Sequence, residues 1–237
     1  MKQSEKKTVG IIGGMGPLAT CDLMEKIIRL TKARTDQENL HLVVDCNTDI
    51  PDRTAAILEH GASPVPQLVR SGIKLQGMGA DVLVMSCNTA HYFYDSIVPY
   101  FDIPLLHMIR ETAKHLKAQE IQKAGLLATS GTLNCGVYRE AMKREDIELL
   151  TPDGEDQEAV MGMIYQGVKA GRTDLDTRRF ERAMEKLLER GAEVLILGCT
   201  ELPVAVSRYG WDYPVADPTQ ILAESVVHYC VEIAEIL

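Results

Sequence analysis

Two cysteines lie in near-copies of one short motif in distant parts of the chain. Cys87 belongs to the segment Ser-Cys-Asn-Thr-Ala-His at residues 86–91, and Cys199 belongs to Gly-Cys-Thr-Glu-Leu-Pro at residues 198–203. A short apolar run precedes each motif and predicts a buried parallel strand. Both thiols are therefore expected at the carboxyl ends of strands, where open α/β sheets bind their ligands. Two thiols facing one crevice could remove a proton from one side of a carbon atom and return one to the other, as racemisation without a cofactor requires.

The other interpretation of each cysteine is structural, because free cysteine is among the most buried residue types and packs like a small hydrophobe. For one cysteine after one strand, that interpretation would be favoured. The matched settings of Cys87 and Cys199 favour a shared chemical role instead. Structural roles are predicted for the four cysteines that lack such a setting, which are Cys21, Cys46, Cys135 and Cys230. No pair has the C-x-x-C spacing of a zinc knuckle or a dithiol redox motif.

The residues that follow Cys87 could tune its thiol or bind a ligand. A helix that begins just after the strand would stabilise a thiolate at its N-terminus. Asn88 and Thr89 can donate hydrogen bonds to a thiolate or to a substrate carboxylate. His91 is close enough to tune Cys87, and it could equally cap a helix or bond a backbone carbonyl.

The segment after Cys199 offers a similar set of polar groups. Thr200 can donate a hydrogen bond to a carboxylate or a thiolate, as Asn88 and Thr89 can. Glu201 could tune Cys199 or bind an ammonium group. The alternative for Glu201 is an acidic residue in the first turn of a helix, where the helix dipole favours negative charge.

Three other features could recognise an anion. The turn at residues 13–16, Gly-Gly-Met-Gly, matches neither G-x-G-x-x-G nor the P-loop pattern, so it either presents backbone N–H groups to a carboxylate or is only a tight turn. Arg53 follows the second predicted strand in a loop, and an arginine can hold a carboxylate by two parallel hydrogen bonds. Lys169 ends a predicted helix, and the residues alone favour a simple interaction with the helix dipole.

The elements that must position these residues alternate between strand and helix. Such alternation predicts parallel sheets with helices on both faces. Strands are predicted at residues 8–12, 40–45, 82–85, 124–128, 147–150, 194–197 and 213–215. Helices are predicted at residues 17–33, 66–78, 109–118, 137–144, 155–169, 176–190 and from 219 onward, with a short one after His91. Loops are predicted at residues 46–53 and 129–132.

A weak internal repeat predicts two similar lobes. Residues 9–13 align with residues 124–128, and Cys87 aligns with Cys199 at nearly the same offset. We therefore expect an α/β fold of two Rossmann-like lobes with parallel sheets, related by a pseudo-twofold axis, with the active site in the cleft between them. The predicted lobes are residues 1–103 and 104–216, and the helix at 217–237 is expected to pack back on the first lobe.

Composition narrows the class of protein further. The 237 residues carry a net charge of −9, which argues against nucleic acid as a partner. No stretch approaches the roughly 18 apolar residues of a membrane span, and the charged N-terminus lacks an apolar signal segment. We therefore expect a cytoplasmic protein with free thiols and no membrane contact. The six histidines show no metal-ligand spacing, so no metal site is predicted.

The motifs together resemble those of the aspartate/glutamate racemases, and the aspartate racemase branch in particular. The resemblance extends over essentially the whole chain. It is carried by Gly-Gly-Met-Gly-Pro at 13–17, Pro-Asp-Arg-Thr at 51–54, Cys-Asn-Thr-Ala-His at 87–91, Gly-Val-Lys-Ala-Gly at 167–171 and Gly-Cys-Thr-Glu at 198–201. The glutamate racemase branch typically has an Asp-Ser-Gly turn near its start and a histidine after the second Cys-Thr, where this chain has Gly-Gly-Met and Glu201.

The resemblance implies a racemase that interconverts L- and D-aspartate, and glutamate as a further candidate, without pyridoxal phosphate or any other cofactor. It implies that Cys87 and Cys199 are the two acid/base groups, that Arg53 and Lys169 recognise substrate carboxylates, and that the protein is a homodimer. Further residues implied to line the substrate pocket are Met15, Asn88, Thr89, Thr129, Thr132 and Thr200.

Related enzymes and other classes of protein supply the alternatives. A maleate cis-trans isomerase would also take a four-carbon diacid, but it would not depend on an α-amino group. A hydantoin racemase is another relative, and an arylmalonate decarboxylase would need only one of the two cysteines. A non-catalytic amino-acid-binding protein and a redox sensor built on Cys87 and Cys199 are the alternatives outside enzyme catalysis.

Overall fold

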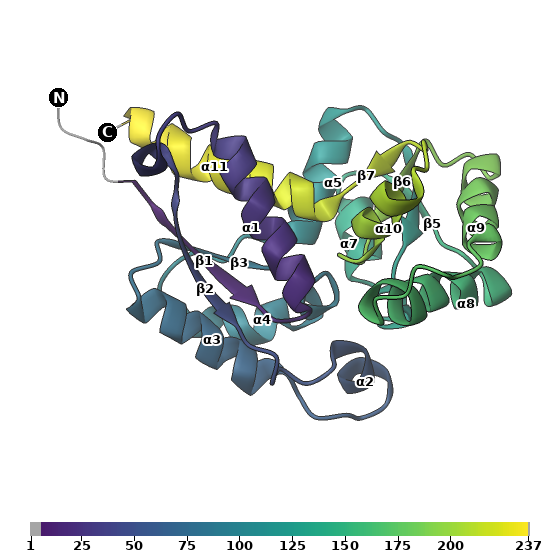
Figure 1. The fold of residues 1–237 in the computed structure, drawn as a ribbon, viewed down its shortest axis with the longest axis horizontal. Coiled ribbons are helices and arrows are strands. Elements are labelled where there is room, and N and C mark those ends of the chain that lie inside the picture. The colour runs from purple at the N-terminus through teal and green to yellow at the C-terminus, as the bar shows by residue number, and fades with distance from the viewer. Residues whose placement is uncertain (1–5, 237) are drawn as a thin grey trace.

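The computed structural model describes residues 6–236 and contains two parallel sheets side by side (Figure 1). The first sheet has the order β2-β1-β3 and the second has the order β5-β4-β6-β7. All strand pairs within them are parallel. The strands are β1 (Thr8–Gly13), β2 (His41–Cys46), β3 (Val82–Met85), β4 (Lys123–Leu127), β5 (Glu148–Leu150), β6 (Val194–Leu197) and β7 (Val215–Ala216).

The two sheets repeat one arrangement. The first strand of each lobe, β1 or β4, lies between the second and the third. Beside β3, Leu105 forms a parallel bridge to Leu83, in the place that β7 occupies beside β6. The two cysteine-bearing strands therefore hold equivalent positions in their sheets, as the internal repeat predicts.

Helices cover both faces of the first sheet, because side chains alternate between the faces of a strand and both faces must be buried. Ile12, Leu83 and Met85 pack on one face with helix α3 (Val65–Gly77). Val9, Ile11, Val82 and Val84 pack on the other face with helices α1 (Pro17–Thr31) and α11 (Pro218–Ile236). The short elements of this lobe are η1 (Asp36–Glu38), α2 (Arg53–Leu58), η2 (Thr89–Phe93), α4 (Tyr94–Ile97) and η3 (Val98–Tyr100).

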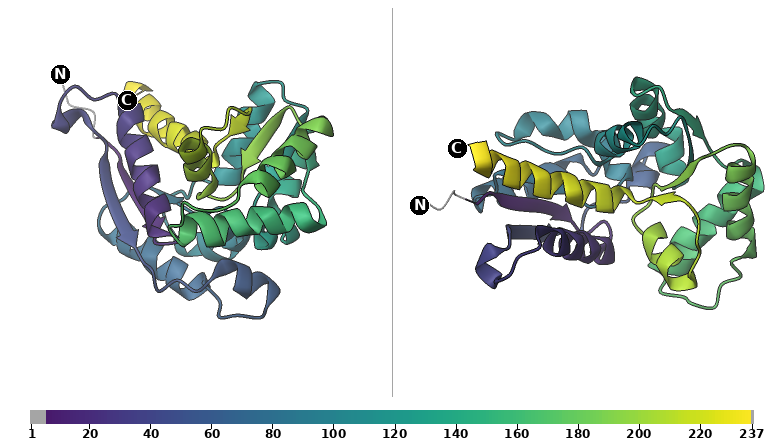
Figure 2. Two further views of the ribbon diagram at one scale, coloured as in Figure 1. Left: turned by 45° about the vertical axis from the view of Figure 1, so that its right-hand side comes forward. Right: turned by 90° about the horizontal axis from the view of Figure 1, so that it is seen from above.

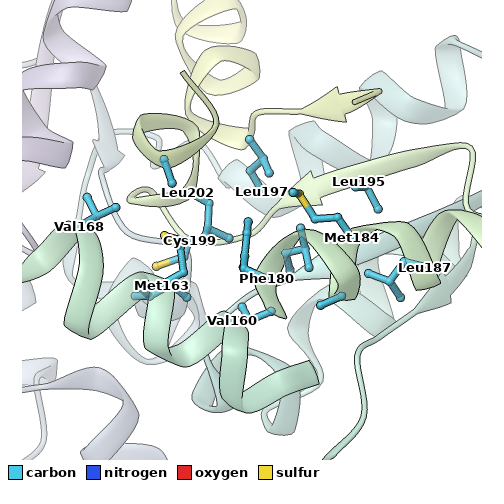
Figure 3. Packing of buried hydrophobic residues seen from close by; sticks show 14 of the residues in the cluster. Val160, Met163, Val168, Phe180, Met184, Leu187, Leu195, Leu197, Cys199 and Leu202 are labelled. Atoms are coloured by element: carbon cyan, nitrogen blue, oxygen red, sulfur yellow. The ribbon is translucent and has the colours of Figure 1, made fainter. Parts of the chain in front are cut away.

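The second sheet is covered in the same way. One face packs against α8 (Gly154–Gly162), the π-helical segment η4 (Met163–Lys169), α9 (Arg178–Glu189) and α10 (Leu202–Tyr209). Figure 3 shows this cluster, in which Cys199 lies among Met163, Val168 and Leu202. The other face packs against α5 (Met108–Ala118) and α7 (Val137–Arg144), and the short helix α6 (Ser130–Asn134) precedes α7.

Two helices cross between the lobes and hold them together. Helix α5 follows the first sheet, yet Ile109, Ala113 and Leu116 pack on the second sheet. Helix α11 follows the second sheet, yet Leu222 and Val226 pack on the first sheet, alongside α1 (Figure 2). Because α5 and α11 also contact each other, each lobe is completed by a helix that leaves the other.

The predicted strand at 213–215 is displaced to Val215–Ala216, and three predicted segments differ from the structure in their type of backbone. The predicted loop at 46–53 ends one residue early, because Asp52 caps α2 and Arg53 is its first residue. The predicted loop at 129–132 contains the start of α6, which Thr129 caps. The predicted helix at 155–169 becomes π-helical from Met163 onward. In each case a polar side chain or a shift in hydrogen bonding, which the apolar pattern does not reveal, decides the local backbone.

No helix among residues 6–236 is both long enough and apolar enough to cross a membrane. Residues 1–5 and 237, which the predicted lobe boundaries include, lie outside the described residues.

The packing of α11 on the first lobe makes a stability prediction. Leu222 is fully buried against the first sheet, so Leu222→Ala should lower the free energy of unfolding by about 2–5 kcal/mol through lost burial and a residual cavity. Urea denaturation followed by circular dichroism measures this change. The same substitution at half-exposed Leu58 should stay within about 0.5 kcal/mol of the wild type. Equal losses of unfolding free energy in the two variants would contradict the conclusion that the packing of α11 on the first sheet stabilises the fold.

Candidate active site

The two cysteines end equivalent strands and face one pocket between the lobes. Cys87 follows β3 and Cys199 follows β6, and their exposed fractions are 6% and 7%. Both line the same pocket. The sequence-predicted residues that line it with them are Met15, Arg53, Asn88, Thr89, Thr129, Lys169, Thr200 and Glu201.

The pocket is narrow and adjoins a larger cavity. Its cavity has a volume of about 10 Å³, which leaves room for about one water molecule. A neighbouring cavity of about 250 Å³ shares Arg53, Lys169 and Glu201 as walls and adds the apolar side chains of Leu18 and Val204. An amino acid therefore needs the walls of the narrow pocket to separate before it can lie between the thiols.

Arg53 enters the pocket from the first turn of α2 and is 8% exposed. Its Nη1 donates to the carbonyls of Ile50 and Pro51 at 3.3 and 3.0 Å, and its Nη2 donates to the carbonyl of Met15 at 3.2 Å. These bonds fix the guanidinium in place. Its Nε is buried without a hydrogen-bond partner among the described residues, and the guanidinium lies close enough to the Cys87 thiol to interact with it.

The Gly-Gly-Met-Gly turn supports Arg53 through a carbonyl. Gly14 has a φ of 90°, and an added Cβ would lie 2.3 Å from the backbone oxygen of Asn47, so only glycine fits. Its N–H donates to Thr20 Oγ1 at 2.9 Å. The predicted alternative of a tight turn therefore describes this segment better than a row of N–H groups aimed at an anion.

Asn88 supplies a second unpartnered donor. It is 1% exposed, and its Oδ1 accepts a hydrogen bond from the Tyr138 hydroxyl at 2.5 Å, which fixes the amide. Its Nδ2 is buried without a partner among the described residues. A buried donor that lacks an acceptor costs about 1–3 kcal/mol, so a ligand that accepts from Asn88 Nδ2 gains that much in affinity.

A cluster of three threonine hydroxyls joins the lobes beside Cys87. Thr89 Oγ1 lies 3.3 Å from Thr129 Oγ1 and 2.8 Å from Thr132 Oγ1. Thr89 and Thr129 line the pocket. Thr132 departs from the expectation, because it is fully buried and lies behind this wall, where it orients the other two hydroxyls.

Lys169 and Glu201 form a charged pair that lines the pocket from the second lobe. Lys169 Nζ lies 4.0 Å from Glu201 Oε1 and 4.6 Å from the centre of the Tyr165 ring. Burial alone would lower the pKa of Lys169, but the Glu201 carboxylate and the neighbouring thiols raise it above its ordinary value. Lys169 is therefore a cation of the pocket and not only a charge at the end of a helix.

Glu201 also contacts Cys199 directly. Cys199 Sγ donates to Glu201 Oε2 at 2.9 Å, and the Thr200 hydroxyl donates to the same oxygen at 3.3 Å. Burial, followed by the negative charge of Glu201, raises the pKa of the Cys199 thiol well above its ordinary value. Of the roles considered for Glu201, contact with Cys199 is the one that the geometry supports.

His91 acts on the backbone of Cys87 from outside the pocket wall. Its Nδ1 lies 2.8 Å from the Cys87 carbonyl oxygen, and its Nε2 accepts from the Met108 N–H at 3.2 Å. This pattern requires a neutral ring with its proton on Nδ1. Burial lowers the pKa of His91 to about 4. His91 therefore anchors the start of the loop that holds Cys87.

Three residues of the pocket wall were missed in the sequence, namely Asp52, Thr54 and Tyr165. Tyr165 could have been found, because it precedes Lys169 by four residues on the predicted helix and so shares its face. Asp52 and Thr54 flank Arg53 but carry no periodic signal. Within the described part of the chain, no three His, Cys, Asp or Glu side chains come together as a metal site.

The fold and the paired thiols define a class of protein, and the comparisons agree with it. The model of the Asp/Glu/hydantoin racemase family matches residues 12–226. The chain belongs to this family and is an isomerase of its racemase class. The sequence-based expectation of this family and of the two-lobed parallel α/β fold is confirmed.

Individual relatives match over nearly the whole chain. The chain is 27% identical to the broad-specificity amino-acid racemase RacX of Bacillus subtilis, over 92% of this chain and 96% of that protein. It is 32% identical to the aspartate racemase of Picrophilus torridus, with a TM-score of 0.78 over 97% of this chain and 94% of that one. The glutamate racemase of Francisella tularensis, solved with D-glutamate, is 15% identical with a TM-score of 0.71 and shares the fold.

The buried neutral histidines make stability depend on pH. The pKa of His91 is about 4 in the folded protein against 6.5 ordinarily, so below pH 6.5 the unfolded chain binds a proton that the folded chain excludes. The free energy of unfolding should be constant above pH 6.5 and should fall by about 3 kcal/mol as the pH drops from 6.5 to 4. Burial lowers the pKa of His107 as well, which acts in the same direction.

Urea denaturation between pH 4 and 8 measures this effect. His91→Asn, which retains a donor for the Cys87 carbonyl, should show a shallower loss of stability with falling pH than the wild type does. His60→Asn, at an exposed position, should retain the wild-type slope. A slope unchanged in the His91 variant would show that His91 is not the group that titrates.

Proposed function

We propose that this protein is an aspartate racemase that works without pyridoxal phosphate, with Cys87 and Cys199 as its two acid/base groups. The observation that carries the proposal is that both thiols, from equivalent strands of two repeated lobes, line one pocket. One thiolate removes the α-proton of the bound amino acid, and the opposite thiol donates a proton to the other face of the carbon. The next turnover begins from the reversed protonation of the pair.

The charges of the pocket support a substrate with two carboxylates. Arg53 and Lys169 are cations that line it from the first and the second lobe, and Arg53 Nε and Asn88 Nδ2 are buried donors without acceptors among the described residues. A carboxylate accepts hydrogen bonds from such donors and neutralises such cations. The Asp52 carboxylate is a candidate partner for the substrate ammonium group.

The relatives support the same reaction class and two ranges of substrate. The Picrophilus torridus protein is an aspartate racemase, and the Bacillus subtilis protein is an amino-acid racemase of broad specificity. The two cations that line the pocket favour a dicarboxylic amino acid over a broader range of substrates, and the Picrophilus torridus relative supports aspartate as that amino acid.

Proton NMR tests the proposed function with purified enzyme in reducing D₂O buffer and no added pyridoxal phosphate. L-aspartate should lose its α-proton signal and yield D-aspartate by chiral chromatography, and L-glutamate should react more slowly. Conversion of maleate to fumarate without exchange of either amino acid would replace the proposal with a maleate isomerase. Binding of aspartate without exchange would indicate an amino-acid-binding protein.

Loss of either thiol should abolish racemisation. Cys87→Ser and Cys199→Ser each remove one of the two proton-transfer groups, so conversion of L- to D-aspartate should fall by at least 100-fold, within the range of about 10²–10⁴ for general acid–base groups. Chiral chromatography measures the conversion, and thermal unfolding checks that the fold persists. Cys135→Ser, outside the pocket wall, is the matched control. Near-normal turnover in either pocket variant contradicts the two-thiol mechanism.

Arg53 should contribute mainly to binding. Arg53→Lys retains a positive charge but loses the Nε donor and the fixed planar group, so the KM for aspartate should rise roughly 10- to 100-fold, as expected for the loss of hydrogen bonds to a charged group worth about 1.5–3 kcal/mol. Steady-state kinetics with L-aspartate measures the change. Unchanged KM and kcat would remove Arg53 from the substrate site.

A further inference from the structure

The two thiols have different neighbours although their motifs match. Glu201 stands two residues after Cys199, and Thr89 stands two residues after Cys87. The Glu201 carboxylate accepts a hydrogen bond from Cys199 Sγ at 2.9 Å. The Thr89 hydroxyl instead bonds to other hydroxyls across the lobe boundary. One thiol therefore contacts a carboxylate where the other has an uncharged group in the corresponding position.

The short contact between Cys199 and Glu201 requires one proton between sulfur and oxygen. Carboxylic acids ordinarily lose their proton about four pH units below thiols. The Lys169 ammonium group lies 4.0 Å from the other carboxylate oxygen of Glu201, and Cys199 Sγ is the donor of the contact. The proton of this pair therefore belongs to the sulfur, and Cys199 is the thiol that donates to the carboxylate.

The surroundings of Cys87 act in the opposite sense. Arg53 lies beside Cys87 and Asp52, which together raise the pKa of its guanidinium although burial lowers it. The pocket is therefore asymmetric in charge, with a carboxylate against one thiol and a guanidinium near the other.

We propose that Glu201 is a positioning residue that holds the resting proton on Cys199 and leaves Cys87 as the base of the resting enzyme. This proposal rests on the two-thiol mechanism proposed above. The enantiomer whose α-hydrogen faces Cys87 then binds the resting enzyme directly, because Cys87 is already the thiolate that removes this hydrogen. The other enantiomer needs the form in which Cys199 is a thiolate beside the Glu201 carboxylate.

One turnover transfers the negative charge from Cys87 to Cys199. The Cα–H bond breaks and its proton goes to the Cys87 thiolate. The electron pair left on the carbon forms a new C–H bond with the proton of Cys199, from the opposite face. The enzyme then holds a Cys87 thiol and a Cys199 thiolate in contact with the Glu201 carboxylate, so the two negative charges raise the free energy of this form.

The other groups that face Cys199 reduce this repulsion without removing it. Lys169 is the cation of this wall and offsets part of it. Tyr165 and Tyr138 also face Cys199, and burial raises the pKa of both hydroxyls, so they remain neutral near pH 7. The Glu201 carboxylate is the negative group that contacts the sulfur.

The difference between the two thiols should change kcat and KM between the two directions, but not their ratio. Two enantiomers have equal free energy in solution, so kcat/KM is the same in both directions. The enantiomer that Cys87 deprotonates should show the lower kcat and the lower KM. The other enantiomer must select the less populated form of the enzyme, which raises its apparent dissociation constant in proportion.

Kinetics of both enantiomers tests the proposal. Deuterium exchange at the α-carbon by the Cys199→Ser variant identifies the enantiomer that faces Cys87, since one thiol reaches one face only. In the wild type, kcat should differ between directions by roughly 5- to 100-fold, within the range for coupled contacting groups. Glu201→Gln retains an acceptor but loses the charge, so the ratio should approach 1. Glu189→Gln, exposed on α9, makes the same charge change and should retain the wild-type ratio.

A second measurement needs no turnover. The rate of Cys199 alkylation by iodoacetamide, followed by peptide mass spectrometry from pH 6 to 10.5, reports the pH at which its thiolate forms. That pH should lie above the value of about 8.5 for a free thiol in the wild type and in Glu189→Gln. In Glu201→Gln it should fall by about one unit or more, since one unit corresponds to about 1.4 kcal/mol of charge interaction.

The outcomes separate this proposal from the proposed function. An unchanged alkylation profile in Glu201→Gln, or a kcat ratio that this substitution does not move, overturns the role of Glu201. Shifted alkylation of Cys199 without racemisation of any amino acid overturns the proposed function and leaves the assignment of the proton intact.

Discussion

The contact between the lobes is the constraint on which the rest of the structure depends, because neither sheet alone brings two thiols together. Cys87 and Cys199 end strands of different sheets, and only the relative placement of the sheets makes them line one pocket. The crossing helices α5 and α11 set that placement by burying apolar side chains against the opposite lobe. Hydrophobic burial far from the chemistry therefore fixes the geometry of the acid/base pair.

Polar contacts at the pocket orient individual side chains, whereas the helices α5 and α11 set the relative placement of the two sheets. The threonine hydroxyls of Thr89 and Thr129 meet across the lobe boundary, and the Met15 carbonyl holds Arg53. His91, kept neutral by burial, holds the Cys87 carbonyl from behind. Each of these contacts is buried, so each one is costly to leave unmade. These contacts orient Arg53, Thr89 and the backbone of Cys87 toward the pocket.

Charge distinguishes two thiols that the fold makes equivalent. The repeated strand order gives Cys87 and Cys199 the same backbone position. Glu201 and Lys169 lie near Cys199, whereas Arg53 lies near Cys87. A racemase handles mirror-image substrates with a chiral protein, so its two halves can share a backbone plan without sharing electrostatics. The side chains after each cysteine are where this molecule departs from its internal symmetry.

The sequence by itself determined the parallel α/β class, the repeat and the paired cysteines, because apolar periodicity and motif spacing are local properties of the chain. The motifs that follow strands also indicated Asn88, Thr89 and Thr200, whereas Met15, Thr129 and the pocket role of Lys169 came from the resemblance to a family. The sequence could not place Thr132 behind the wall or make Arg53 helical, since these follow from packing and from capping by Asp52 and Thr129. Nor could it choose among the roles of Glu201 and His91. Those choices depend on distances between residues from different elements, and only the tertiary structure sets such distances.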